Sequence, residues 1–95
     1  MEIFSPIVGV HFRSSEAKHV HNALVIGDYV DLAAEPDNHY DPMAVQVLYA
    51  GEIIGYVARA NNYQISEHLT NGGEATARIV DHEGNKKILL ITWDD

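Results

Sequence analysis

The sequence of 95 residues contains no cysteine, which excludes disulfide bridges, thiolate zinc sites and cysteine nucleophiles. It also lacks long apolar runs, because the longest cover only four residues and a membrane span needs roughly 20. The N-terminal stretch has neither a basic region nor a cleavable apolar core, so it does not read as a signal peptide. From these absences we expect no contact with a membrane and a cytoplasmic location.

Basic residues are scarce. Six Lys and Arg stand against 14 Asp and Glu, and the formal net charge is −8. This balance argues against a broad, sequence-blind surface for binding phosphates. Residues 11–21 are the exception, because this segment contains two basic residues, Arg13 and Lys18, one acidic residue, Glu16, and three histidines. Any binding of a polyanion should therefore be local, and it should respond to pH near neutrality.

Catalytic motifs are absent as well. The sequence has no GxSxG elbow, P-loop, HExxH or Rossmann fingerprint, so we expect neither an enzyme nor a cofactor. One minor alternative is a metal-dependent hydrolase. If His19 and His21 lay on a strand, their rings would face the same side and could share one zinc ion. Two histidines are weak evidence without a full ligand set, and we predict no metal site.

The pattern of the remaining residues predicts one domain over residues 1–95, in which short β-branched segments alternate with turn signals. Strands are expected at residues 7–12, 28–34, 43–50, 53–57, 75–80 and 86–92. Residues 13–22 look polar and irregular, and the state of Ala23–Ile26, a helical turn or the start of a strand, stays open.

The hydrophobic period changes across residues 58–69, where apolar positions recur every three to four residues and predict a short helix. Asn62 weakens this stripe, and Asn71-Gly72-Gly73 supplies a left-handed stop. Six strands with one or two short helices predict a mainly β fold. We expect a small OB-like six-stranded barrel or a half-open roll, which leaves few exposed strand edges.

The loop Glu35–Pro42, which reads EPDNHYDP, gathers the most unusual residues of the chain. Asn38 and Asp41 are natural Asx-turn formers, and the two prolines stiffen the backbone around Tyr40. Such a loop is either a rigid turn with Tyr40 folded onto the core or a small polar site.

Four ordered segments identify a family. They resemble the HIRAN domain, with a specific EPDNxYDPxAV block followed by GYVxR, and they lie at residues 8–10, 27–32, 35–47 and 54–59. The resemblance covers about residues 8–80, most of the chain, and is closest to the small stand-alone bacterial members. It implies an OB-like barrel that binds single-stranded DNA and captures a free 3′-hydroxyl end, with a role in DNA repair.

The resemblance also implies roles for individual residues. Asp41 would accept a hydrogen bond from the terminal hydroxyl, and Asn38 and Tyr40 would shape the pocket around the last nucleotides. Phe12 would stack on a base, while Tyr56 and Arg59 would supply a ring and a cation for phosphate. A carboxylate repels a phosphate, so Asp41 would select against a strand that continues past the end.

Two features favour an alternative function. His11 stands where helicase-linked members often carry arginine, and a neutral imidazole is a poorer phosphate partner than a guanidinium. Together with the acidic balance, this favours a protein-interaction or homo-oligomeric module that has lost nucleic-acid binding.

Overall fold

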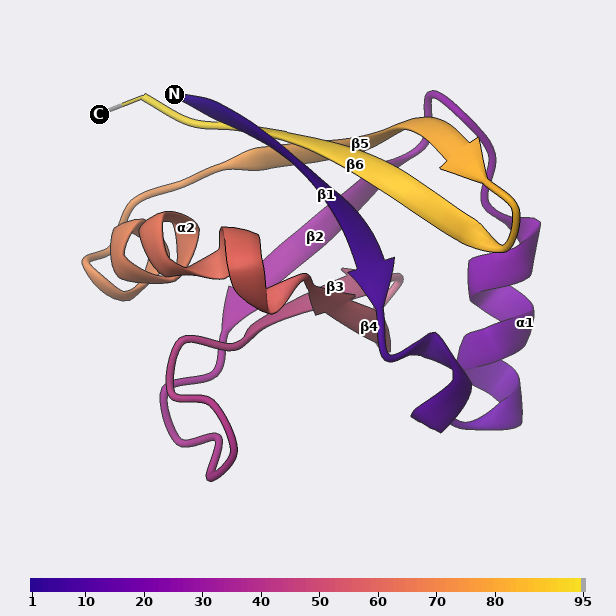
Figure 1. The fold of residues 1–95 in the computed structure, drawn as a ribbon, viewed down its shortest axis with the longest axis horizontal. Coiled ribbons are helices and arrows are strands. Elements are labelled where there is room, and N and C mark those ends of the chain that lie inside the picture. The colour runs from indigo at the N-terminus through magenta and orange to yellow at the C-terminus, as the bar shows by residue number, and fades with distance from the viewer. Residues whose placement is uncertain (95) are drawn as a thin grey trace.

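Six antiparallel strands form a closed barrel in the order β1-β4-β3-β2-β5-β6 (Figure 1). The computed structural model describes residues 1–94. The elements are, in chain order, β1 (Glu2–Val8), the 3₁₀ helix η1 (Val10–Phe12), α1 (Ser15–Ala23), β2 (Tyr29–Ala34), β3 (Val45–Tyr49), β4 (Glu52–Val57), the 3₁₀ helix η2 (Arg59–Asn61), α2 (Asn62–Thr70), β5 (Thr76–Glu83) and β6 (Lys86–Thr92). The expectation of a mainly β, OB-like six-stranded fold is confirmed, and the barrel is closed rather than half-open.

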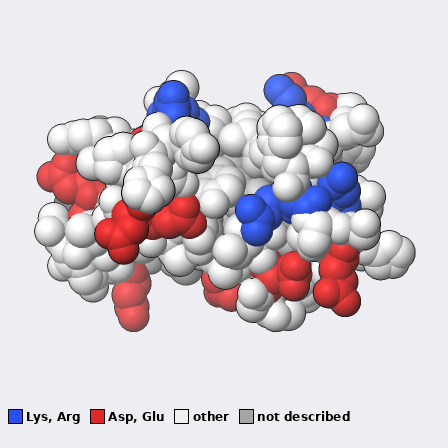
Figure 2. All heavy atoms as spheres, turned by 90° about the horizontal axis from the view of Figure 1, so that it is seen from below, with Lys and Arg blue, Asp and Glu red and all other residues white. Residues whose placement is uncertain are grey.

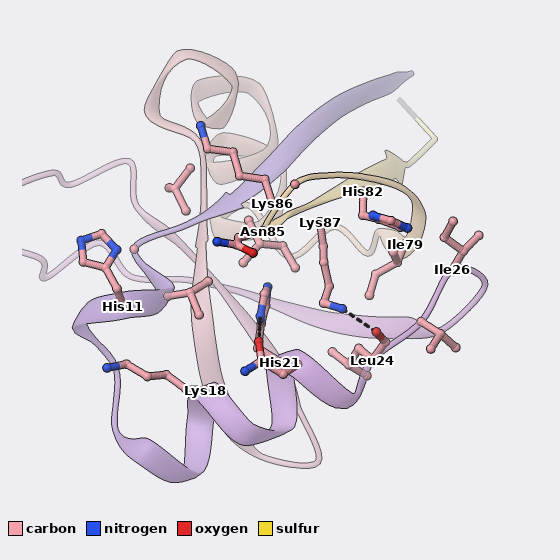
Figure 3. A pocket seen from close by; sticks show the side chains of 17 residues that line it. His11, Lys18, His21, Leu24, Ile26, Ile79, His82, Asn85, Lys86 and Lys87 are labelled. Atoms are coloured by element: carbon pink, nitrogen blue, oxygen red, sulfur yellow. Dashed lines mark hydrogen bonds between the residues drawn. The ribbon is translucent and has the colours of Figure 1, made fainter.

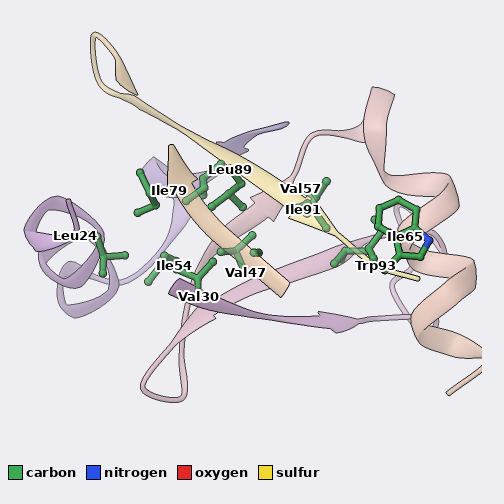
Figure 4. Close-up of a cluster of buried hydrophobic side chains, with 13 residues drawn as sticks. Leu24, Val30, Val47, Ile54, Val57, Ile65, Ile79, Leu89, Ile91 and Trp93 are labelled. Carbon is green, nitrogen blue, oxygen red and sulfur yellow. The ribbon is translucent and has the colours of Figure 1, made fainter. Parts of the chain in front are cut away.

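The core lies inside the barrel because alternate residues of each strand point inward. Val45, Val47 and Ile54 are fully buried there. Leu24 packs at one end of the core, where α1 ends, and Ile65 of α2 packs at the other beside Trp93 (Figure 4). Trp93 is only 7% exposed, so this ring contributes to stability and is not free to stack on a ligand.

The first strand does not lie where the sequence predicted it. The first strand is Glu2–Val8 rather than residues 7–12, because β1 pairs with two neighbours: Phe4 lies opposite Leu90, and Val8 lies opposite Tyr56. Gly9 then takes φ 73°, a left-handed conformation that turns the chain into η1. Phe12 consequently lies in a 3₁₀ turn and not at the end of a strand.

The stretch expected to be irregular forms α1. Ser14 caps this helix, since its Oγ accepts a hydrogen bond from the backbone N–H of Ala17 at 3.1 Å. The sequence left Ala23–Ile26 open between a helical turn and the start of a strand. In the structure Ala23 is the last residue of α1, and Leu24 is its C-cap.

The geometry that the zinc hypothesis needs is also absent, because α1 is a helix. His21 is buried and His19 is exposed, so the two rings do not share a side. Within residues 1–94, no three His, Asp or Glu side chains come close enough to hold a metal ion.

The second helical region agrees with the prediction, although it opens with the 3₁₀ turn η2. Gly72 adopts φ 86°, and the N–H of Gly73 donates to the carbonyl of His68 at 2.9 Å, which closes α2. The hairpin between β3 and β4 turns at Ala50-Gly51, one residue earlier than expected, and both residues have positive φ.

The two ends of the described chain lie side by side (Figure 1). The amino group of Met1 donates to the carbonyl of Trp93 at 2.8 Å, and the N–H of Trp93 donates to the carbonyl of Met1 at 3.0 Å. No helix within residues 1–94 is long and apolar enough to cross a membrane.

Candidate functional site

The loop between β2 and β3 is held in shape by Asn38. Its Oδ1 accepts hydrogen bonds from the backbone N–H groups of Tyr40 and Asp41, at 2.8 and 3.0 Å. Its Nδ2 donates to the carboxylate of Glu35 at 2.6 Å. An Asn at this position therefore bends the backbone by the Asx-turn chemistry expected from the sequence. The Asn38 side chain therefore uses its hydrogen bonds to hold the shape of the loop.

Asp41 is bound on three sides and remains partly open to solvent. Its Oδ1 accepts from the backbone N–H of Met43 at 2.9 Å, and its Oδ2 accepts from Nδ2 of Asn62, also at 2.9 Å. The Nε of Arg59 lies 3.4 Å from the same Oδ2, and the Asp41 side chain is 19% exposed. An ionised carboxylate has about four lone-pair positions, so Oδ1 keeps capacity for one more donor.

The environment favours the ionised form of Asp41. Partial burial opposes ionisation, but the hydrogen bonds from Met43 and Asn62 and the nearby Arg59 outweigh it and lower the pKa of Asp41. The side chain is therefore an acceptor with a full negative charge at neutral pH. Such a group binds a hydroxyl donor and repels a phosphate.

Arg59 lies at the start of η2, directly after β4. Its Nη2 donates to the carbonyl of Tyr40 at 3.1 Å, so the same guanidinium contacts both Tyr40 and Asp41. The Arg59 side chain is 73% exposed and its guanidinium has five N–H donors, which leaves donors free for a ligand. The backbone of the preceding residue is held by Ser5, whose buried Oγ accepts from the N–H of Ala58 at 2.9 Å.

Tyr56 of β4 bonds the loop through Glu35 and lies beside Gly9, the residue before η1. Its hydroxyl donates to the Glu35 carboxylate at 3.3 Å, and Gln46 donates to that carboxylate as well. Burial and the charge of Glu35 both raise the pKa of Tyr56, which keeps the phenol protonated. On the other side, a side chain at Gly9 would touch the Tyr56 ring at 3.8 Å.

Three of the residues singled out in the sequence carry exposed aromatic or imidazole rings, and they are His11, Phe12 and Tyr40. Tyr40 is 90% exposed and Phe12 is 81% exposed, whereas an apolar ring ordinarily gains by burial. The rings of His11 and Phe12 pack against each other with centroids 4.0 Å apart. Tyr40 is thus not folded onto the core, and Phe12 presents an open face to solvent.

The seven residues singled out in the sequence fall into two groups, one joined to the loop between β2 and β3 and the other in η1. The hydrogen bonds and ion pair described above join Asn38, Tyr40, Asp41 and Arg59, and Tyr56 joins them through Glu35. His11 and Phe12 belong to η1, where their rings pack against each other. Figure 2 shows the molecule from below: Lys and Arg atoms form a short stretch on the right half of this face, with Asp and Glu side chains to its left and along the lower edge.

Sequence reasoning missed two residues of the network, Glu35 and Asn62. Asn62 was visible as a polar interruption in an apolar helix stripe, and it is 4% exposed. A buried amide needs a partner, so the interruption itself indicated that Asn62 bonds a polar group outside the helix.

A closed, antiparallel six-stranded barrel with two short helices places this chain among the small OB-like barrel proteins. The chain belongs to the HIRAN domain family, whose model matches residues 1–93, and HIRAN is a DNA-binding domain rather than a catalytic one.

Two solved structures resemble the barrel. A protein from Lactobacillus plantarum superposes with a TM-score of 0.82 at 20% identity, over 96% of this chain and 93% of that chain. The HIRAN domain of human HLTF superposes with a TM-score of 0.78 at 17% identity, over 97% of this chain and 74% of that chain. No curated protein matches the sequence.

Proposed function

We propose that this protein binds single-stranded DNA by its 3′-hydroxyl end, with Asp41 as the acceptor for the terminal hydroxyl. The observation that carries the proposal is the state of Asp41, which is ionised, held in place by Asn62 and Met43, and still partly open to solvent. A hydroxyl fits such an acceptor, and an internal phosphate at the same point meets like charge.

The exposed rings supply the remaining affinity. Stacking of a base on an aromatic side chain contributes about 1–3 kcal/mol and does not depend on base identity. Phe12 and Tyr40 are open for such contacts, and Arg59 has donors left for the adjacent phosphate. This division gives sequence-tolerant binding together with selection of the strand end.

The decisive experiment compares two oligonucleotides that differ only at the end. We expect a strand with a 3′-hydroxyl to bind at least about tenfold more tightly than one with a 3′-phosphate, measured by fluorescence anisotropy. The variant Asp41→Asn should lose this preference. Asp37→Asn is the matched control, because Asp37 is an exposed carboxylate of the same loop. Equal affinity of the unmodified protein for both ends would refute end recognition.

Self-association is a second candidate function, favoured by a row of residues on the outer surface of the barrel. Phe4 and Tyr29 are 58% and 63% exposed, and the strand register places Leu90 and Arg78 between them. Exposed apolar surface of this kind is common at interfaces between chains. Light scattering with and without oligonucleotide tests it: a stable oligomer indifferent to DNA supports assembly, and a monomer excludes it.

A further inference from the structure

A second surface, outside the Asp41 network, concentrates much of the protein's positive charge. It is a groove between α1 and the β5–β6 hairpin, with η1 at its near end (Figure 3). Three of the six Lys and Arg residues and three of the six histidines line it, and they are Lys18, Lys86, Lys87, His11, His21 and His82. No Asp or Glu of residues 1–94 is among the lining residues.

This absence of carboxylates is unusual in a chain of net charge −8. On β5, Asp81 and Glu83 flank His82, but alternation along a strand directs them to the other side. A second hollow of the barrel, lined by Glu2, Asp31 and two further acids, shows the opposite character. The acidic balance of the whole protein therefore does not describe this groove.

Two details show that the groove is organised. Lys87 is fixed in its middle, because its Nζ donates to the carbonyl of Leu24 at 2.6 Å and so ties the hairpin to the end of α1. His21 is 3% exposed, its Nδ1 pairs with Asn22, and its Nε2 is buried without a hydrogen-bond partner. An unpaired buried polar atom costs stability, so the wall of the groove at His21 is less stable than ordinary packing would make it.

The size and the position of the groove narrow the choice of ligand. Its volume of about 1210 Å³ exceeds the roughly 300–1,000 Å³ of ordinary small-molecule pockets, which leaves room for an extended ligand. His11 lines its near end and also packs on Phe12 of the candidate site. The groove therefore begins beside Phe12.

We propose that this groove binds the phosphates of the DNA strand on the 5′ side of the captured end, with Lys18 and Lys86 as the movable cations. This inference rests on the proposed function for its direction along the strand. It assigns the protein a two-part interface: an end site with little net positive charge, and a basic groove that gives affinity in proportion to strand length.

The test measures the effect of strand length. A thymidine trimer and a decamer, both with a 3′-hydroxyl, are titrated against the full protein and the Lys18→Ala/Lys86→Ala variant. The variant should bind the decamer at least about fivefold more weakly, and its affinity for the trimer should hardly change. The slope of log affinity against log salt concentration, measured on the decamer, should fall in magnitude by about 1.4, or ~0.7 for each lost phosphate contact. Lys87 is left in place because it anchors the hairpin.

His19→Ala is the control, since His19 is an exposed side chain beside Lys18 on α1 that does not line the groove. It should change neither affinity by more than about twofold. Lysine substitutions that weaken trimer and decamer equally, or neither, would overturn the proposal. Inorganic pyrophosphate serves as the competing probe: tight binding in the groove, combined with no advantage of decamer over trimer, would assign it to a small phosphate compound and reject a DNA strand.

The outcomes separate the two proposals. If 3′-hydroxyl and 3′-phosphate decamers bind equally but the lysine variant still loses the decamer, end recognition fails and the groove stands. If end selectivity persists and the lysine variant behaves like the unmodified protein, the groove fails alone. If the unmodified protein binds no oligonucleotide, both fail.

Discussion

The side-chain amide of Asn62 donates a hydrogen bond to Asp41 Oδ2 at 2.9 Å, which joins the first residue of α2 to the loop between β2 and β3. Asn62 is 4% exposed, so its amide is held by the core while its donor points at a carboxylate that faces solvent. The helix thereby fixes the orientation of the acceptor on which end recognition depends.

Removal of this amide should affect both stability and selectivity. Asn62→Ala leaves Asp41 with one donor fewer, and we expect it to lower the free energy of unfolding by about 1–2 kcal/mol. The preference for a 3′-hydroxyl over a 3′-phosphate should also shrink, because Oδ2 is no longer oriented. Chemical denaturation and anisotropy measure the two effects. A variant with full selectivity would show that Asn62 has only a structural role.

Phe12 should matter for binding and not for folding. Its ring is 81% exposed, so Phe12→Ala should leave the melting temperature nearly unchanged. Loss of stacking should weaken binding of single-stranded DNA by about 1–3 kcal/mol. Tyr63→Ala is the matched control. It removes an exposed ring on α2 and should bind DNA normally. Equal losses in the two variants would exclude a specific stacking role.

Gly55 should tolerate no side chain. A Cβ at this position would lie 2.6 Å from Cγ2 of Ile7 and 2.7 Å from the carbonyl oxygen of Val8, and the second of these is backbone that cannot move aside. Gly55→Ala should therefore force β1 and β4 apart and destabilise the protein by about 1–3 kcal/mol. Thermal and urea unfolding measure this change, and a loss below about 0.5 kcal/mol would contradict the close approach.

The β3–β4 turn offers a stabilising substitution. Ala50 has φ 51° beside Gly51 at φ 82°, and alanine occupies the left-handed region at a cost. Ala50→Asn or Ala50→Gly relieves that cost, because two-residue hairpin turns with two positive φ values favour these residues. We expect the free energy of unfolding to rise by about 0.5–1 kcal/mol. An unchanged melting temperature would show that the turn bears no strain.

Protonation of His21 should destabilise the fold. Burial lowers the pKa of His21, the bond with Asn22 acts the other way, and the charge of Lys87 on β6 lowers it further. The unfolded chain then binds more protons than the folded one below about pH 6.5, so stability is complete above that pH and decreases as the pH falls toward the folded pKa. Urea unfolding without DNA, between about pH 7.5 and 5, measures the decrease.

The two histidines of α1 provide the comparison for that experiment. His21→Gln removes the titrating ring and should flatten the pH dependence of stability. His19→Gln, on the exposed side of the same helix, should leave the dependence as it is. An identical pH profile for all three proteins would assign the effect to other groups.

The sequence predicted the strands well where alternation is strong. Val45 and Val47 lie on one side of β3 as their spacing indicated, and the helix stripe ending at Leu69 placed α2 correctly. It failed on α1, because the helix face there is short and includes a histidine: Ala17, Val20 and Leu24 recur at helical spacing with His21 between them. Because His21 is polar, the buried face of α1 does not show up in the sequence as a regular apolar repeat.

The candidate site, too, could be predicted from the sequence only in part. The Asx-turn residues Asn38 and Asp41 follow from local chemistry, and the structure places both in one loop as expected. The partners of Asp41 and Tyr56 come from distant parts of the chain, since Asn62 is 21 residues from Asp41 and Glu35 is 21 residues from Tyr56. Such pairs depend on the register of strands and helices, which no local pattern specifies. The roles proposed for the seven residues stay predictions.

The reciprocal hydrogen bonds between Met1 and Trp93 have a consequence for engineering the domain. A short peptide bridge across that point, with a new opening at Gly84-Asn85 in the β5–β6 hairpin, would yield a circularly permuted chain that retains every strand pair of the barrel. The same adjacency means that the domain can be inserted within a host protein as a cassette, with both junctions at one place on its surface.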